Sequence, residues 1–154
     1  MSQHIEESID VDVPIRTVYN QWTQFEEFPA FMEGVKAVKQ LDDKHIAWRA
    51  EIAGREVEWT AEITQQEPDT RIGWRSTLGV HNAGSVTFMP LTPRKTRVTL
   101  RLTWEPDGGL QTTAGFFGIV KGRVKGDVER FKEFIEGRGH ETGAWRGSIH
   151  GGSS

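Results

Sequence analysis

The chain contains a series of short segments in which apolar and polar residues alternate, and this pattern constrains the fold more than any other feature. Near the start, Ile5, Ile9 and Val11 share one phase, while charged and polar residues occupy the other. Such alternation predicts a β-strand with one buried and one solvated face. A sheet built from one-sided strands needs a cover, because its apolar face cannot remain in water.

Further strands are predicted from Gly34 to about Leu41 and around residues 46–52, 57–63, 72–76, 86–88 and 98–104. A two-residue turn at residues 53–54 predicts a hairpin in which Trp48 pairs with Trp59. The same register places Arg49 opposite Glu58, so the hairpin would also join opposite charges.

Two short helices are predicted directly after the first strand. Pro14 is a typical first-turn residue, and Val18 and Trp22 follow it at helical spacing. A second short helix is predicted around Glu26–Phe31, where Pro29 would interrupt it. The chain therefore begins with a strand and two helices and continues with strands.

The cover for the sheet is predicted in the last third of the chain. Apolar residues recur there at three- and four-residue steps, which predicts an amphipathic helix from about residue 112 to 136. At 1.5 Å per residue such a helix spans about 37 Å, enough to cross a curved sheet. We therefore expect a single domain at residues 1–137 and a flexible Gly/Ser-rich tail at residues 138–154, with no role assigned to Trp145.

Two sequence segments resemble a known family. Residues 18–32 read VYNQWTQFEEFPAFM, with an early V-Y-N helix and an F-P-x-F step, and residues 130–136 read RFKEFIE. These segments, and the order of the elements over roughly residues 3–137, resemble the polyketide cyclase/dehydrase and coenzyme Q-binding branch of the START-like (SRPBCC) superfamily. The resemblance implies an α+β helix-grip fold, in which a curved antiparallel sheet of about seven strands wraps a long C-terminal helix. It also implies an apolar ligand between sheet and helix, since members of such families cyclise or dehydrate polyketides or carry lipids, quinones or steroids.

Tryptophans on the apolar phase of separate strands are the first candidate site feature. They either fill core volume or line an aromatic pocket for a flat ligand. Each glycine inside the covering helix costs about 0.5–1 kcal/mol of stability relative to alanine. Three explanations for these glycines are open: close packing on the sheet, room for a ligand, and helix–helix packing. These glycines are Gly115, Gly118, Gly122 and Gly126. The predicted apolar lining is Trp22, Phe28, Phe31, Trp48, Trp59, Trp74, Phe88, Trp104 and Phe117.

Polar residues on the buried phase of the strands are the second candidate feature, namely Glu7, Arg55, Ser76 and Asn82. If the first strand pairs antiparallel with the last, strand directions bring them to the edge where the long helix begins. We predict that they are polar anchors at the mouth of a cavity. Alternatively, they are hydrated residues at the rim of the sheet, or Glu7 and Arg55 form a structural ion pair. Glu7 is also the one weak candidate for acid–base catalysis.

Charge and composition exclude several function classes. A net charge of −3 gives no basic field for nucleic acid, and the absence of cysteine excludes thiol catalysis and cysteine-ligated zinc. The five histidines follow no metal-ligand spacing and no phosphate-binding glycine loop occurs, so neither a metal nor a cofactor is predicted. No apolar run is long enough for a transmembrane segment, and we expect a cytoplasmic location. The oligomeric state is open.

The sequence thus favours a protein that binds a hydrophobic small molecule (a lipid, quinone or polyketide-like compound) in a cavity between the sheet and the C-terminal helix. Two alternatives stay open. One is a polyketide cyclase/dehydrase (aromatase), with Glu7 or Arg55 polarising a carbonyl group or moving a proton. The other is a protein-interaction module with a filled core, which would use the arginine-rich outer face of the sheet. A role without catalysis is favoured because no nucleophile geometry is indicated.

Overall fold

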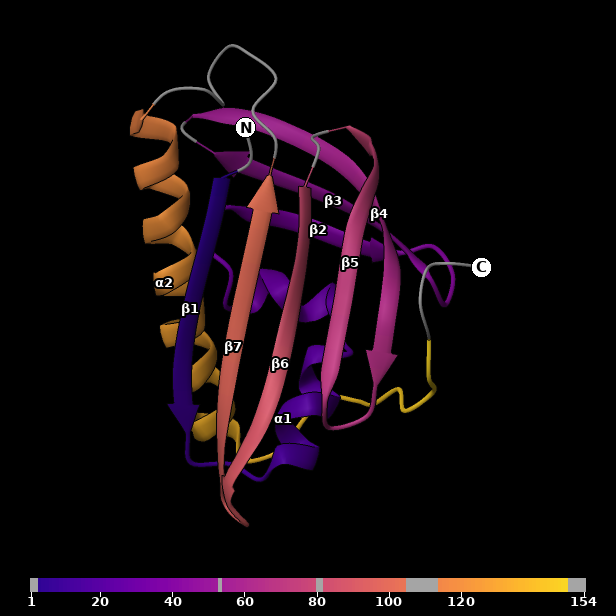
Figure 1. The fold of residues 1–154 in the computed structure, drawn as a ribbon, viewed down its shortest axis with the longest axis vertical. Coiled ribbons are helices and arrows are strands. Elements are labelled where there is room, and N and C mark those ends of the chain that lie inside the picture. The colour runs from indigo at the N-terminus through magenta and orange to yellow at the C-terminus, as the bar shows by residue number, and fades with distance from the viewer. Residues whose placement is uncertain (1–2, 53, 80–81, 105–113, 150–154) are drawn as a thin grey trace.

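The computed structural model describes residues 3–52, 54–79, 82–104 and 114–149 (Figure 1). Seven strands form one antiparallel sheet in the order β1-β7-β6-β5-β4-β3-β2. They are β1 Gln3–Val11, β2 Val35–Gln40, β3 His45–Ile52, β4 Arg55–Glu67, β5 Arg71–Gly79, β6 Asn82–Thr92 and β7 Lys95–Trp104. The helices are α1 Ile15–Trp22, the 3₁₀ helix η1 Phe25–Ala30 and the long helix α2 Ala114–Arg138. This architecture confirms the predicted helix-grip fold.

The hydrophobic alternation and one tight turn set the register of the sheet. Trp48 pairs with Trp59 and Arg49 with Glu58, as predicted. Gly54 has φ +79°, the left-handed conformation that a two-residue hairpin turn requires and that glycine adopts without steric cost. At the other side of the sheet, β1 pairs antiparallel with β7, so the first and last strands of the chain lie side by side.

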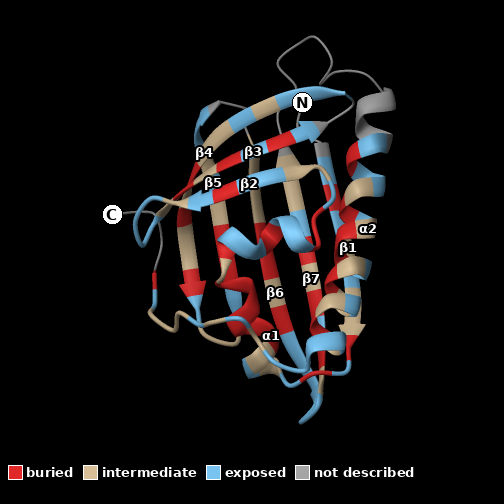
Figure 2. Ribbon diagram, turned by 180° about the vertical axis from the view of Figure 1, so that it is seen from behind, coloured by how far each residue is buried: buried red, intermediate tan, exposed pale blue. Residues whose placement is uncertain are grey.

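The helices cover the concave face of the curved sheet (Figure 2). The long helix α2 runs along the β1 side, while α1 and η1 lie over the centre of the face. On α2, Val124, Val128, Phe131 and Ile135 are buried, which confirms the predicted apolar stripe.

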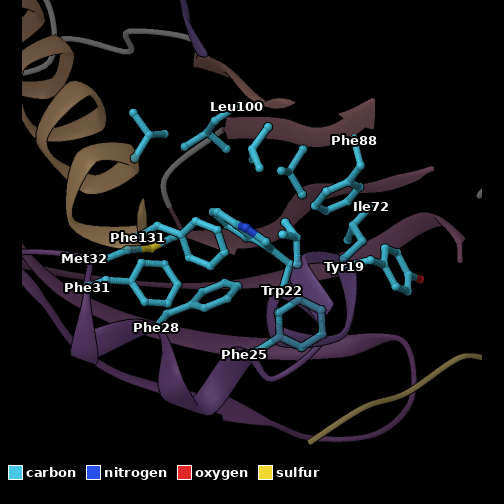
Figure 3. Packing of buried hydrophobic residues seen from close by; sticks show 14 of the residues in the cluster. Tyr19, Trp22, Phe25, Phe28, Phe31, Met32, Ile72, Phe88, Leu100 and Phe131 are labelled. Carbon is cyan, nitrogen blue, oxygen red and sulfur yellow. The ribbon is translucent and has the colours of Figure 1, made fainter. Parts of the chain in front are cut away.

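Aromatic side chains fill the part of the concave face beneath α1 and η1 (Figure 3). Here the name aromatic cluster is used for Trp22, Phe25, Phe28, Phe31 and Phe131. Ring centroids of Trp22 and Phe31 each lie 5.1 Å from that of Phe131, and the rings of Trp22 and Phe28 meet edge to face at 5.4 Å. Such pairs contribute about 0.5–1.5 kcal/mol each beyond simple burial. This part of the interior is therefore solid core.

The segment after α2 packs against the domain. Ile149 forms an antiparallel bridge with Gln66 of β4, through N–H···O bonds of 2.7 and 2.8 Å. Trp145 packs against the core, and its backbone N–H donates to Thr23 Oγ1 at 3.1 Å. The structure here differs from the flexible tail predicted for residues 138–154, because a Gly-rich composition does not reveal partners that the fold brings close.

The same segment pairs polar groups of α1 that are buried. The Asn20 side chain donates to Glu141 at 2.8 Å and accepts a hydrogen bond from Arg146 at 2.7 Å. Arg146 also forms an ion pair of 2.9 Å with Asp69. A buried amide without partners is costly, so this segment belongs to the folded domain. The predicted flexibility of residues 150–154 lies outside the described residues.

Replacement of Arg146 tests this role of the C-terminal segment. The Arg146→Ala change removes the hydrogen bond to Asn20, the ion pair to Asp69 and a cation–π contact of 5.5 Å with Tyr19. We expect the free energy of unfolding, measured by urea denaturation, to fall by about 1–3 kcal/mol. The matched control is Arg94→Ala, at an exposed arginine between β6 and β7, which should change it by less than about 0.5 kcal/mol. Equal effects would contradict a structural role for the segment.

Candidate functional site

A pocket with a volume of about 130 Å³ lies between the first half of α2 and the sheet. It adjoins the aromatic cluster, so the concave face is divided into a solid part and a hollow part. Most of its wall is apolar, and the polar atoms come from a few residues. The residues that line it are Met32, Glu33, Gly34, Val35, Trp48, Ala50, Glu51, Trp59, Trp74, Asn82, Leu100, Leu102, Val120, Arg123, Val124 and Asp127.

Indole rings from neighbouring strands form one wall of the pocket. Trp48 and Trp59 stack with centroids 5.5 Å apart and an interplanar angle of 8°, because the β3–β4 register places them directly opposite each other. Within the described part of the chain, both of their Nε1 atoms are buried without a hydrogen-bond partner. An unpaired buried donor costs about 1–3 kcal/mol, and the Trp22 indole of the aromatic cluster carries the same cost.

Trp74 adds a third indole, and its position depends on Gly84. A Cβ atom at Gly84 would lie 2.5 Å from the Trp74 ring and 3.0 Å from the Arg101 carbonyl oxygen. The indole therefore occupies the space that a side chain of the neighbouring strand would take. The predicted glycines of α2 behave differently: a Cβ at Gly122 would meet nothing within 4 Å, while one at Gly126 would meet the Arg130 guanidinium at 2.8 Å.

Charged residues also line the pocket, and here the name charged wall is used for Glu33, Glu51, Arg123 and Asp127. The Arg123 guanidinium donates to the backbone carbonyls of Glu33 and Glu51 at 3.1 and 3.0 Å. It lies directly over Gly34, whose φ of +89° also disfavours any larger residue. One arginine thus fastens α2 to the start of β2 and the end of β3.

Asp127 is the buried carboxyl group of this wall. Its Oδ1 accepts the Glu33 backbone N–H at 3.1 Å and pairs with Arg130, whose own Nε donates to the Phe31 carbonyl at 3.0 Å. Burial raises the pKa of Asp127 from 3.8 to about 6, although Arg130, the Glu33 N–H and Arg123 all act to lower it. A carboxyl group that titrates near neutral pH beside an apolar pocket is able to hold or move a proton.

Asp127 was not among the residues predicted for the site, although the sequence carries a signal for it. The residue falls on the apolar stripe of α2, three positions after Val124 and one before Val128. A single acid on a buried helix stripe is as informative as a polar residue on a buried strand phase.

Several predicted lining residues meet at the pocket, and others do not. Trp48, Trp59, Trp74 and Asn82 line it. The structure instead places Trp22, Phe28, Phe31 and Phe88 in the packed core, outside this lining. The reason is that α1 and η1 close over their part of the sheet. The side chains of Trp104 and Phe117 lie outside the part of the structure that is described.

The predicted polar anchors also separate. Arg55 is exposed where β4 leaves its turn, and the half-buried Glu7, which pairs with Leu100 across β1 and β7, is not part of the pocket lining. Ser76 accepts a hydrogen bond of 3.0 Å from the Asn82 backbone N–H, so it supports the strand end at which Asn82 reaches the pocket. Among the described residues, no three His, Asp or Glu side chains gather in a way that would hold a metal ion.

Comparison with known proteins identifies the family of the chain. The model of the family "Polyketide cyclase / dehydrase and lipid transport" matches residues 11–136. The chain belongs to this family. A 17.2 kDa protein encoded in the melC2-rnhH intergenic region of Streptomyces lincolnensis is 47% identical over 146 residues, which are 94% of this chain and 97% of that protein.

Solved structures share the fold. DR_A0006 from Deinococcus radiodurans is 29% identical with a TM-score of 0.70, covering 88% of this chain and 99% of its own. The Zhui aromatase/cyclase from Streptomyces sp. R1128 has a TM-score of 0.71 at 13% identity, over 90% and 94% of the two chains. A START superfamily protein from Mycobacterium smegmatis has a TM-score of 0.65 at 18% identity, over 88% and 95%. The START-like resemblance is thereby confirmed. Separately, the described residues contain no helix with the length and apolar character of a membrane span.

Two glycine replacements test how the indole wall is built. Gly84→Ala should lower the free energy of unfolding by about 1–3 kcal/mol, because its methyl group overlaps the Trp74 ring. The control Gly122→Ala adds the same methyl group in open space on a helix. This variant should raise the free energy of unfolding by about 0.5–1 kcal/mol. Chemical denaturation measures both values. A neutral Gly84→Ala would show that Trp74 does not depend on this site.

The pH dependence of stability tests the state of Asp127. Because its pKa is raised from 3.8 to about 6, the folded protein holds this proton more tightly than the unfolded chain. The contribution of Asp127 to the free energy of unfolding is therefore highest below pH 4 and is lost as the pH rises through about 6. Asp127→Asn cannot ionise and should become more stable relative to the wild type across that interval, in urea titrations at successive pH values.

The matched control for that experiment is Glu129→Gln, which removes an exposed carboxyl group from the same helix. It should not reproduce the change. A difference between wild type and Asp127→Asn that stays constant with pH would contradict the shifted pKa.

Proposed function

We propose that the protein binds a hydrophobic small molecule in the pocket between α2 and the tryptophan-bearing strands. The observation that carries the proposal is a largely apolar hollow beside a solid core, with the stacked rings of Trp48 and Trp59 on one side. Flat indole faces offer a large contact area at low entropic cost, which suits a planar ligand. The family description, which joins polyketide cyclisation with lipid transport, supports the same class of ligand.

The size of the pocket supports a ligand with a small ring system. Its volume of about 130 Å³ is close to that of an engineered cavity of about 150 Å³ that binds benzene in another protein. One or two fused rings would occupy the hollow, and any longer substituent would extend out of it. A quinone or a polyketide-like ring fits this description better than a fully enclosed long acyl chain.

A second candidate function is that of a polyketide cyclase/dehydrase, and Asp127 is the observation that favours it. Proton transfer at a carbonyl group needs an acid or base whose pKa lies near the working pH. Asp127, at about 6 and on the pocket wall, is a better candidate for that role than Glu7 or Arg55. Turnover of a poly-β-keto substrate that is lost in Asp127→Asn would support it.

The interaction-module hypothesis receives less support. It requires a filled core, and the pocket argues against one. On the outer face, Arg97 and Arg101 each reach a carboxylate of β1 at 2.8 Å. Exposed pairs of this kind contribute about 0–1 kcal/mol and are typical of a solvated sheet face.

Filling the pocket tests the proposed function. Ala50→Leu adds three carbon atoms at a buried lining position of β3. We expect it to weaken the binding of naphthalene, measured by quenching of tryptophan emission, at least about tenfold, because the added side chain takes the space of the ring. Ala47→Leu is the matched control, since it makes the same change on the same strand but in the opposite phase.

Native mass spectrometry of the freshly purified protein complements this test by detecting a molecule that copurifies. Equal naphthalene affinity in the two alanine variants, or no binding by the wild type, would contradict the proposal.

A further inference from the structure

The two oxygens of the Asp127 carboxyl group have different surroundings. Oδ1 accepts the Glu33 N–H and the pair with Arg130, whereas no hydrogen bond to Oδ2 is found among the described residues. The residue is only 9% exposed and belongs to the pocket wall. Oδ2 is also not among the fully buried atoms without a partner, so it is accessible at the pocket wall, where a ligand donor would replace water.

The other charged groups at the pocket oppose an anionic ligand. Glu33 and Glu51 add two further carboxylates to the wall. Arg123 faces Asp127 from the same helix, but its guanidinium is already engaged by the carbonyl groups of Glu33 and Glu51. Arg130 is likewise engaged by Asp127 and by the Phe31 carbonyl. Both cations near Asp127 are thus already paired with protein acceptors, and the three carboxyl groups of the charged wall disfavour a ligand carboxylate or phosphate.

A cationic ligand fits less well than a neutral one with a single donor. An ammonium group carries three donors and a charge that is costly to place against the apolar and aromatic surfaces of the pocket, whereas Asp127 offers it one carboxylate oxygen without a bond among the described residues. A hydroxyl group carries one donor and matches that single acceptor. The ring to which it is attached would lie against the indoles.

We propose that Asp127 is the ligand-anchoring residue of the pocket, and that the ligand is a neutral ring compound whose hydroxyl group donates to Asp127 Oδ2. This inference rests on the proposed function, and it narrows the ligand from any hydrophobic molecule to a hydroxylated ring such as a phenol. It also fixes the orientation of the ligand, with its ring toward Trp48 and Trp59 and its hydroxyl group toward α2.

The anchor has a dependence on pH that a purely apolar pocket lacks. The carboxylate accepts a hydrogen bond more strongly than the neutral acid. Burial raises the pKa of Asp127, while Arg130, the Glu33 backbone N–H and Arg123 lower it, and the carboxyl groups of Glu33 before β2 and Glu51 on β3 line the same pocket. Since the pKa of Asp127 is about 6, affinity for a hydroxylated ring should rise between pH 5 and pH 7.5. A phenol titrates near pH 10, outside this range.

The experiment compares two probes of nearly equal shape, 2-naphthol and 2-methoxynaphthalene. Only 2-naphthol is a donor. By isothermal titration calorimetry at pH 7.5, the wild type should bind 2-naphthol about tenfold more tightly or better. That preference should shrink severalfold at pH 5, while the affinity for 2-methoxynaphthalene should stay constant.

Asp127→Asn reverses the hydrogen-bonding character of the anchor. The amide oxygen can take the place of Oδ1, which leaves an NH₂ donor at the position of Oδ2. This variant should lose the preference for 2-naphthol and its pH dependence, and should bind the methyl ether as well or better. Glu129→Gln, which alters an exposed carboxyl group of the same helix, should behave like the wild type.

The outcomes separate the two proposals. If both probes bind equally and independently of pH, Asp127 is not the anchor, and the proposed hydrophobic pocket stands. If neither probe nor naphthalene binds, the proposed function fails and this inference fails with it. If Asp127→Asn does not fold, the pH dependence of the two wild-type affinities decides the question by itself.

Discussion

The structure depends on how the apolar face of a one-sided sheet is covered. Seven strands expose one continuous apolar concave surface, and no single helix is wide enough to cover it. Two groups of helices share this surface, since α1 and η1 bring the aromatic cluster to one part and α2 runs beside the other (Figure 2). Where the aromatic cluster ends, bulky indoles on the sheet meet the small valines of α2, and the surfaces do not fill the space between them.

Polar rather than apolar contacts fasten α2 at that place. At the edge of the pocket Arg123 donates to two backbone carbonyls, which is possible because Gly34 has no side chain in the space of the guanidinium. Asp127 and Arg130 add bonds to the Glu33 N–H and the Phe31 carbonyl. An apolar contact would have to close the hollow to hold the helix, whereas hydrogen bonds at its edge hold the helix at a distance. The same contacts thus stabilise the fold and keep the pocket open.

Sequence patterns predicted what depends on local periodicity and left out what depends on tertiary approach. The strands, the Trp48–Trp59 register and the stripe of α2 follow from alternation and helical spacing. The division of the interior into packed core and pocket does not follow from these patterns. Phe31 and Trp74 are both large and apolar, and only the path of η1 determines that Phe31 is packed in the core. The docking of Arg146 on Asn20 was equally invisible, since it joins residues 126 positions apart.

The hydrogen bonds of Asp127 help to hold α2, but the charge of its carboxyl group does not add to stability at neutral pH. A carboxyl group whose pKa is raised by burial destabilises the folded state at neutral pH, and an uncharged residue on the same stripe would avoid that penalty. The buried indole N–H groups of Trp48 and Trp59, unpaired among the described residues, act in the same direction. The Trp22 indole of the aromatic cluster has the same unpaired N–H, so these donors do not distinguish the pocket from the core, whereas the buried carboxyl group of Asp127 does. Local consistency fails where a surface is arranged for something other than the fold, and on the pocket wall it fails at Asp127.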